Sequence, residues 1–158
     1  MRQTRAILVG ALTAIAVTAS AGLASDGTTD SLAAWKAEPG RIFDSSEVAL
    51  DAFLWEARPI VIFADTPQDP AFRRQIELFE ARIDELIRRD VVLITDTSRA
   101  DPSDLREKLR PRGFMLTIIG KDGAVKLRKP FPWDVREVSR SIDKMPLRQQ
   151  EIRESVDN

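Results

Sequence analysis

Two aspartates of the chain stand where a folded α/β protein could use them for chemistry. Asp65 directly follows the apolar run 60–64, and Asp96 comes just after a second apolar run at 91–94. If both runs are parallel strands, the two carboxylates lie at the edge of the sheet where ligands usually bind. The same two loops hold four further oxygen donors, which are Thr66, Asp69, Thr97 and Asp101. Because Mg²⁺ and Ca²⁺ prefer oxygen ligands, Asp65 and Asp96 are candidate metal ligands of a carboxylate-based, divalent-cation-dependent enzyme.

A structural interpretation of the same aspartates stays open. Asp69 and Asp101 each precede a proline, which is the pattern of a helix N-cap followed by proline in the first turn. Asp65 and Asp96 can equally end strands and accept hydrogen bonds from their own loops. Convergence of the carboxylates on one point would favour a cation, and engagement with backbone amides would favour capping.

Positive charge gathers on a predicted hairpin around residues 121–128. This strip could hold an anionic ligand or the acidic face of a partner. It could also be a solvated edge whose lysines prevent unwanted strand pairing. We expect the binding surface to combine the loop 65–70 with this hairpin. The candidate ligand- or partner-binding residues are therefore Asp65, Thr66, Asp69, Lys121, Lys126, Arg128 and Arg148.

The residue types that are missing exclude several kinds of catalysis. The chain has no cysteine and no histidine, so disulfide exchange, thiol peroxidase chemistry and the Ser-His-Asp and Cys-His arrangements are impossible. Metal sites built on sulfur or imidazole are excluded for the same reason. Lipid attachment at an N-terminal cysteine is excluded as well, and we predict no cofactor.

The first residues have the pattern of a secretory signal peptide. Arg2 and Arg5 form a basic start, residues 6–18 carry no charge, and Ala19-Ser20-Ala21 offers small residues for cleavage. An uncleaved anchor is the alternative, although the apolar run is short for a membrane span. We therefore predict a cleaved signal peptide over 1–21 and a periplasmic or secreted protein.

Cleavage would leave a chain without a global electrostatic reason to bind nucleic acid. The full chain has 24 basic and 25 acidic residues, and removal of Arg2 and Arg5 leaves 22 against 25, a net charge of −3. Nucleic acids and anionic membranes attract basic proteins. We predict no nucleic-acid partner and no stable membrane anchor after cleavage. The expected partner is another envelope protein or a small anionic ligand.

Beyond the signal peptide, the pattern predicts a mobile leader over 22–44, rich in small and polar residues, and one α/β domain over 45–158. Strands are predicted at 60–64, 91–94, 114–119 and 124–128. The last two are joined by an Asp-Gly turn that favours a hairpin. Helices are predicted at 70–89, after Pro102 and from Trp133.

The predicted order β-α-β-α-β-β-α defines a fold class. A helical crossover makes the first two strands parallel, and the hairpin makes the last two antiparallel. This is the thioredoxin-like arrangement, a three-layer α/β/α domain with a mixed four-stranded sheet. We expect Trp55 and Trp133, which lie at the ends of elements, to contribute packing rather than binding.

Several blocks of the sequence resemble a bacterial family of thioredoxin-like domains of unknown function. The blocks are Arg58-Pro-Ile-Val-Ile-Phe-Ala64, Asp69-Pro70, Arg89-Asp-Val-Val92, Gly113-Phe114, Ile119-Gly-Lys-Asp-Gly-Ala-Val-Lys-Leu-Arg128 and Ile142-Asp-Lys-Met-Pro-Leu-Arg148. That family is peroxiredoxin-related and is similar to the P-DUDES modules of secreted sushi-repeat matrix proteins. The resemblance covers about residues 55–154. It implies a thioredoxin fold and an extracytoplasmic setting, and it implies no established activity.

The chain departs from true thioredoxins at both of their functional hallmarks. Residues 65–70 stand where thioredoxins carry their redox pair, and Arg112-Gly113-Phe114 replaces the proline before the third strand. Thr66 matches the threonine of peroxiredoxins, but no cysteine follows it. We therefore predict a redox-inactive, thioredoxin-like binding domain, with the cation-dependent enzyme at Asp65 and Asp96 as the alternative.

Overall fold

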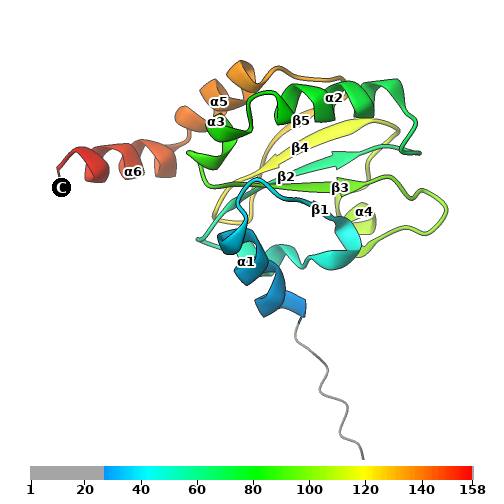
Figure 1. Ribbon diagram of the computed structural model, residues 1–158, viewed down its shortest axis with the longest axis horizontal. Coiled ribbons are helices and arrows are strands. Elements are labelled where there is room, and N and C mark those ends of the chain that lie inside the picture. Colours follow the sequence, from blue (N-terminus) through cyan, green and yellow to red (C-terminus); the bar gives the residue numbers. More distant parts are fainter. Residues whose placement is uncertain (1–26, 158) are drawn as a thin grey trace, which may run out of the picture.

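The computed structural model describes residues 27–157, which form an α/β domain with one mixed sheet (Figure 1). The sheet holds five strands in the order β1-β3-β2-β4-β5. Their bounds are Ile42–Asp44 for β1, Arg58–Phe63 for β2, Val91–Asp96 for β3, Met115–Ile119 for β4 and Val125–Lys129 for β5. The predicted signal peptide over 1–21 lies outside the described residues.

The strand directions are those of a thioredoxin-like sheet. β1 and β2 are parallel to β3, whereas β4 is antiparallel to β2 and β5 is antiparallel to β4. Helices make the crossover from β2 to β3, as a parallel pair requires. The turn before β5 has Gly123 at a φ of 75°, a conformation that glycine adopts without strain. The predicted α/β class with a mixed sheet is confirmed.

The predicted strand number and the predicted leader both differ from the structure. Residues Gly27–Ala37 form helix α1, and β1 adds a fifth strand at the edge of the sheet, beside β3. Trp35 anchors this segment, because its side chain is buried and its Nε1 donates to the carbonyl oxygen of Val91 at 3.2 Å. Small and polar residues dominate the segment, so periodicity does not reveal a three-residue strand or a single aromatic anchor.

Helices cover both faces of the sheet (Figure 1). Helices α2, α3 and α5 pack on one face, and α1, α4 and two 3₁₀ turns pack on the other. The helix bounds are Pro70–Glu80 for α2, Ile83–Ile87 for α3, Asp104–Leu109 for α4, Val135–Asp143 for α5 and Pro146–Val156 for α6. The 3₁₀ turns are η1, Ser45–Glu47, and η2, Leu50–Phe53.

Two details of the helix predictions are corrected. The single helix predicted over 70–89 is two helices, because the backbone leaves helical geometry at Arg82, with φ −141° and ψ 37°. Asp69 caps α2 as predicted, since its Oδ1 accepts from the backbone N–H groups of Ala71 and Phe72 at 2.8 and 3.2 Å. The cap of α4 is Ser103 rather than Asp101.

The central strand β2 is buried along its whole length, as an uninterrupted β-branched run predicts. Ile60 and Ile62 point into the core that α2, α3 and α5 cover. Val61 and Phe63 point into the core beneath α1 and α4. Because β2 is held on both faces, the residues at its two ends are placed rigidly.

Helix α6 differs from the other helices in having no buried residue. It extends away from the body of the domain (Figure 1). None of the helices within the described range is long and apolar enough to cross a membrane.

Candidate functional site

At the carboxyl end of the sheet, Asp96 is buried in an ion pair with Arg106. Asp96 is 1% exposed, and its Oδ1 accepts from Nε and Nη2 of Arg106 at 2.9 and 2.8 Å. The Ser103 hydroxyl donates to the other carboxylate oxygen. Nη2 also donates to the carbonyl oxygens of Ala64 and Asp96 at 2.6 and 2.9 Å. The charge of Asp96 is thus balanced inside the domain.

Asp65 lies beside the same arginine but closer to solvent. Its carboxylate is 2.9 Å from Nη1 of Arg99 and 3.8 Å from Nη1 of Arg106. Asp65 and Asp96 therefore both lie beside the guanidinium group of Arg106. This group occupies the position at which a metal ion bound by both carboxylates would lie. No group of three or more potential metal-binding side chains is found among residues 27–157.

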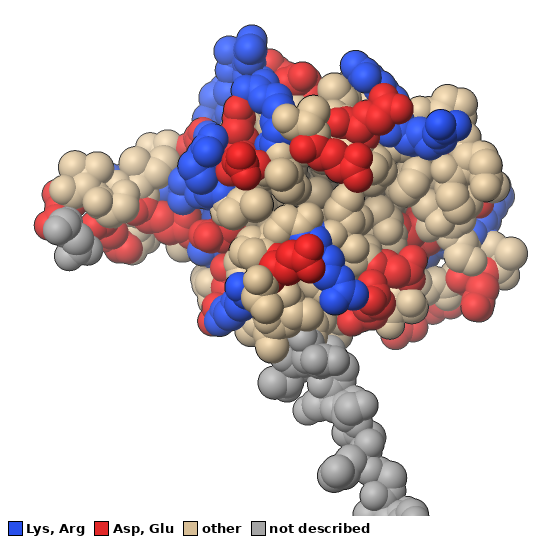
Figure 2. Space-filling view, viewed as in Figure 1, with Lys and Arg blue, Asp and Glu red and all other residues tan. Residues whose placement is uncertain are grey.

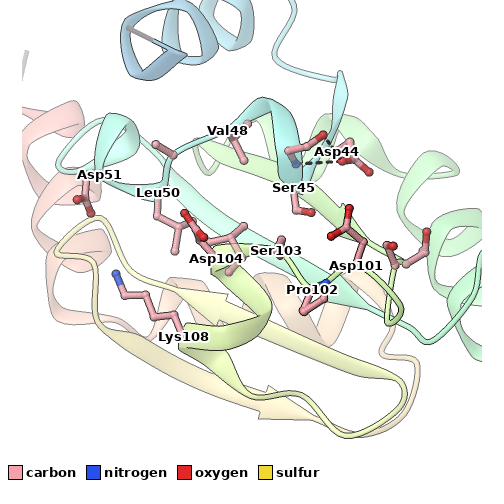
Figure 3. A pocket seen from close by; sticks show the side chains of 15 residues that line it. Asp44, Ser45, Val48, Leu50, Asp51, Asp101, Pro102, Ser103, Asp104 and Lys108 are labelled. Carbon is pink, nitrogen blue, oxygen red and sulfur yellow. Dashed lines mark hydrogen bonds between the residues drawn. The ribbon is translucent and has the colours of Figure 1, made fainter.

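A cavity of about 590 Å³ lies at the same end of the sheet, between residues 44–51 and 97–108. We call it the acidic cavity. Figure 3 shows its labelled side chains coming from these two facing segments, with Lys108 as the labelled cation. Its acidic lining residues are Asp44, Asp51, Asp101 and Asp104. Sequence reasoning missed this cavity, because one of its walls belongs to the segment preceding the predicted strands.

The acids of this cavity are partly used by the fold. Asp44 is the N-cap of η1, where its carboxylate accepts from the backbone and the hydroxyl of Ser46 at 3.0 and 2.6 Å. Glu47 completes the capping box by accepting from the backbone N–H of Asp44 at 2.8 Å. These contacts explain the acids of η1 as structural groups.

The predicted basic hairpin lies at the opposite end of the sheet. Phe63 pairs with Met115 and Ile60 pairs with Ile118, so the turn after β4 lies near the start of β2. The loop 65–70, at the other end of β2, is therefore not brought together with Lys121 and Lys126, contrary to the predicted combined surface. Thr66 is exposed in that loop, and Asp69 is engaged as a helix cap.

The individual cations of the hairpin have different surroundings. Lys121 donates to Asp90 at 2.8 Å and lies 3.0 Å from Glu151. Lys126 donates to Asp122 at 2.6 Å, and this hydrogen bond lowers the pKa of the Asp122 carboxyl. Arg128 points elsewhere, since its Nη1 donates to the carbonyl oxygen of Leu109 at 2.5 Å. Arg128 is thus attached to the C-terminal end of α4, away from the turn.

Glu151 of α6 binds three cations, an arrangement we call the Glu151 network. Arg58 and Lys121 come from other elements, and Arg148 lies three residues earlier on α6. The Glu151 carboxylate lies 2.8 Å from Arg58, 3.0 Å from Lys121 and 3.1 Å from Arg148. Partial burial opposes ionisation, but hydrogen bonds from these three cations outweigh it and lower the pKa of Glu151 to about 2. The network attaches α6 to the start of β2 and to the hairpin.

Four of the sequence blocks that carry the family resemblance meet at this network. Arg58 begins the first block, Asp90 lies in the block 89–92, Lys121 lies in the block 119–128, and Arg148 closes the last. Asp143 of the last block also pairs with Arg89 through two hydrogen bonds of 2.9 and 2.8 Å. Arg148, a predicted binding residue, donates to the carbonyl oxygen of Arg88 at 3.2 Å and thereby holds α6.

Beside the Glu151 network is a second cavity of about 450 Å³, which we call the basic pocket. Its cationic lining residues are Arg58, Lys121, Lys126 and Arg153, and its one acid is Asp122. Its other lining residues are Trp55, Gly120, Met145, Pro146, Leu147 and Gln150. The pocket therefore combines an apolar wall with an excess of positive charge.

Trp55, which was expected to pack, is instead exposed at the rim of this pocket. Its side chain is 67% exposed, and its φ is 65°. A left-handed conformation costs a bulky residue about 1–2 kcal/mol, and here no burial compensates for it. A hydrogen bond of 2.7 Å from its backbone N–H to the carbonyl oxygen of Lys121 holds it against the hairpin. Nothing in the sequence around Trp55 signals this conformation. Trp133, by contrast, packs against the core as expected.

The sheet order and the missing cysteines define the class of the protein as a thioredoxin-like α/β domain without thiol chemistry. The chain belongs to the family described as domain of unknown function DUF4174, whose profile matches residues 49–151. No curated protein matches the chain.

The solved structures that are similar to the chain include two peroxiredoxin-type proteins of Plasmodium. The mitochondrial 2-Cys peroxiredoxin of Plasmodium falciparum is 20% identical, with a TM-score of 0.42, over 60% of this chain and 78% of that one. The thioredoxin peroxidase I of Plasmodium yoelii is 16% identical, with a TM-score of 0.48, over 67% of this chain and 84% of that one. Both names describe peroxidases, whereas the present chain has no cysteine.

Proposed function

We propose that the chain is a redox-inactive, thioredoxin-like domain that acts outside the cytoplasm by binding an anionic ligand or an acidic partner. The observation that carries the proposal is the exposed, strained Trp55 beside the basic pocket. Residues held in sparsely populated backbone conformations are concentrated at functional sites. The family resemblance supports the extracytoplasmic setting, and the lack of cysteine leaves the domain without the thiol chemistry of peroxiredoxins.

The basic pocket replaces the surface predicted from the sequence. Of the predicted residues, Lys121 and Lys126 line it directly, and Arg148 helps to hold α6, which forms one of its walls, by donating to the carbonyl oxygen of Arg88. Asp65 and Asp69 lie at the other end of the sheet and are engaged in an ion pair and a helix cap. The cation-dependent enzyme receives no support from this geometry, because Arg106 already neutralises Asp96.

A fluorescence titration tests the proposal. Of the three tryptophans of the chain, Trp35 is buried and Trp133 is packed, so ligands at the basic pocket should alter mainly the emission of Trp55. We expect organic carboxylates to shift that emission, and we expect the double variant Lys126→Glu, Arg153→Glu to abolish the shift. The double variant Lys108→Glu, Arg136→Glu, which changes the net charge by the same amount elsewhere, should respond like the wild type. Equal responses of the two double variants would reject the basic pocket as the site.

The extracytoplasmic setting has its own test. Expression of the full chain in a bacterium with an outer membrane should yield periplasmic protein whose intact mass lacks residues 1–21. Retention of those residues in the membrane fraction would support an uncleaved anchor instead.

A further inference from the structure

Trp55 sits at the centre of an exposed apolar surface that extends beyond the basic pocket. Leu54 and Val125 are also exposed, at 38% and 40%. Leu54 lies over the hairpin turn, where a Cβ built on Gly123 would meet its Cδ2 at 2.8 Å. Val125 begins β5 directly after that turn. The apolar surface thus runs from the pocket along the hairpin.

The four cations that line the basic pocket differ in whether the fold already binds them in buried ion pairs or leaves them accessible to a ligand. Arg58 is almost fully buried and bound to Glu151, and Lys121 is shared between Asp90 and Glu151. Arg153, by contrast, is exposed and has no ion-pair partner within the part of the chain that the structure describes. Lys126 is exposed and shares only the surface carboxylate of Asp122. Arg153 and Lys126 are therefore the cations that a ligand could reach.

The size and openness of the site decide between a small molecule and a chain. A volume of about 450 Å³ lies in the lower half of the ~300–1,000 Å³ typical of ligand pockets. Tight small-molecule sites enclose most of their ligand, but here Trp55 and Arg153 at the rim are both exposed. A ligand that continues past the rim, over Leu54 and Val125, would cover more apolar area than one confined to the pocket.

We propose that the basic pocket binds an acidic peptide segment of another protein. One large apolar or aromatic side chain of that segment would enter against Trp55, Met145 and Leu147. Flanking carboxylates would bind Arg153 and Lys126. This inference rests on the proposed function and names its partner class. Aromatic anchors surrounded by charged rims are the usual composition of protein-binding surfaces.

A defined peptide tests the proposal by calorimetry and Trp55 fluorescence. The probe is an acetylated, amidated peptide Glu-Glu-Phe-Glu-Glu, compared with Glu-Glu-Ala-Glu-Glu, Lys-Lys-Phe-Lys-Lys and free N-acetylglutamate. We expect the first peptide to bind at least about tenfold more tightly than the other probes, because it alone supplies both the aromatic group and the carboxylates.

Variants of the domain separate binding from folding. Trp55→Gly removes the indole while its backbone adopts a φ of 65° without strain, so we expect a melting temperature within about 3 °C of the wild type and binding about tenfold weaker. Arg153→Glu should weaken binding about fivefold. The matched controls are Phe131→Ala, another exposed aromatic, and Arg136→Glu, another exposed helical arginine. Both should bind like the wild type.

The outcomes distinguish this inference from the proposed function. Equal binding of the Phe and Ala peptides, or undiminished binding by Trp55→Gly, would overturn the peptide inference. If N-acetylglutamate perturbs Trp55 as strongly as the peptide, the site takes small anions, and only the proposed function survives. If no anion perturbs Trp55, both proposals fail.

Discussion

The side chain of Arg106 determines that Asp96 forms a buried ion pair and does not act as a free carboxylate. Its guanidinium binds the Asp96 carboxylate, two carbonyl oxygens and the π face of Phe63, whose ring centre is 5.5 Å away. A buried carboxylate without a partner is very unfavourable. The Arg106–Asp96 ion pair therefore stabilises the fold little more than apolar residues of the same volume would. Removal of only one of the two residues, however, lowers the free energy of unfolding strongly, because it leaves a buried charge without a partner.

We expect Arg106→Met to destabilise the domain by about 3–5 kcal/mol, because it leaves Asp96 buried and unpaired. Arg99→Met, which removes only an exposed partner of Asp65, should cost less than about 1 kcal/mol. The double variant Arg106→Met, Asp96→Asn should recover part of the loss, since the uncompensated charge is gone. Urea denaturation measures all three. Equal losses for the two single arginine variants would show that the buried pair has no special role.

The positions of Asp65 and Asp96 could be predicted from the sequence, but their roles could not. Each follows a β-branched run, and the runs are the strands β2 and β3. The partner that decides the chemistry is Arg106, which reaches back from α4. The direction of that long side chain depends on tertiary packing against Phe63, and no local pattern records it.

Helix α6 depends on ion pairs where the other helices depend on apolar packing. None of its residues is buried, so its attachment rests on polar contacts: Glu151 binds Arg58 and Lys121, and Arg148 donates to the carbonyl oxygen of Arg88. Ion pairs that are partly open to solvent are weakened by salt. The wall that α6 gives to the basic pocket is therefore the part of the domain most sensitive to ionic conditions.

The Glu151 network gives a pH dependence with a definite sign. Glu151 has an ordinary pKa of 4.5 and a pKa of about 2 in the folded domain. Because the folded value is depressed, the stabilisation is fully present above pH 4.5 and is lost as the pH falls towards 2. Solvent screening reduces its contribution to about 1–2 kcal/mol.

Glu151→Gln isolates this contribution from those of the other carboxylates. We expect the variant to be less stable than the wild type by about 1–2 kcal/mol at pH 7, and we expect the difference to shrink as the pH falls from 4.5 towards 2. Thermal unfolding at a series of pH values measures it. Glu137→Gln, which breaks an exposed pair on α5, should cost less than about 0.5 kcal/mol. A constant difference between wild type and Glu151→Gln at all pH values would contradict the assignment.

At the scale of elements, long apolar runs were predictable and short or polar ones were not. The stripe through Phe72, Phe79 and Leu86 correctly places helices after Pro70, but it cannot show the break at Arg82, because the apolar spacing continues through both helices. β1 and α1 escape prediction for the opposite reason. Their stability comes from pairing with β3 and from the buried Trp35, and both contacts are distant in sequence.

The whole molecule has two chemically different ends. Acids line the cavity beside the carboxyl ends of the parallel strands, and cations line the pocket at the opposite end. Figure 2 shows basic and acidic side chains interspersed over the face in view, so the separation concerns the linings of the two cavities and not the surface as a whole. The sequence predicted Lys121 and Lys126 at the basic end and Asp65 and Asp69 at the other end, but it joined them in one surface. Most acids of the cavity lining were not predicted. Because β4 runs antiparallel to β2, the turn after β4 lies beside the start of β2, whereas the loop 65–70 follows the end of β2.

The effect of divalent cations on the melting temperature tests whether the acidic end of the molecule binds metal. A cation that binds the folded domain raises its stability by about 2.7 kcal/mol at a concentration of 100 times Kd. For a domain of this size that is a rise in Tm of roughly 5–10 °C. Because Arg106 occupies the space between Asp65 and Asp96, we expect Mg²⁺, Ca²⁺ and EDTA to leave the Tm of the wild type unchanged.

Arg106→Ala is the matched variant for this experiment, because it removes the guanidinium and leaves both carboxylates in place. We expect it to melt at a lower temperature than the wild type and to regain stability when Mg²⁺ or Ca²⁺ is added, since a cation can then offset the charge of Asp96. A cation-dependent rise in the wild-type Tm, abolished by Asp65→Ala or Asp96→Ala, would contradict this account. It would show that the aspartates bind metal despite Arg106 and would restore the cation-dependent enzyme as the leading function. A cation response confined to Arg106→Ala would show instead that the arginine has taken the place of a metal ion.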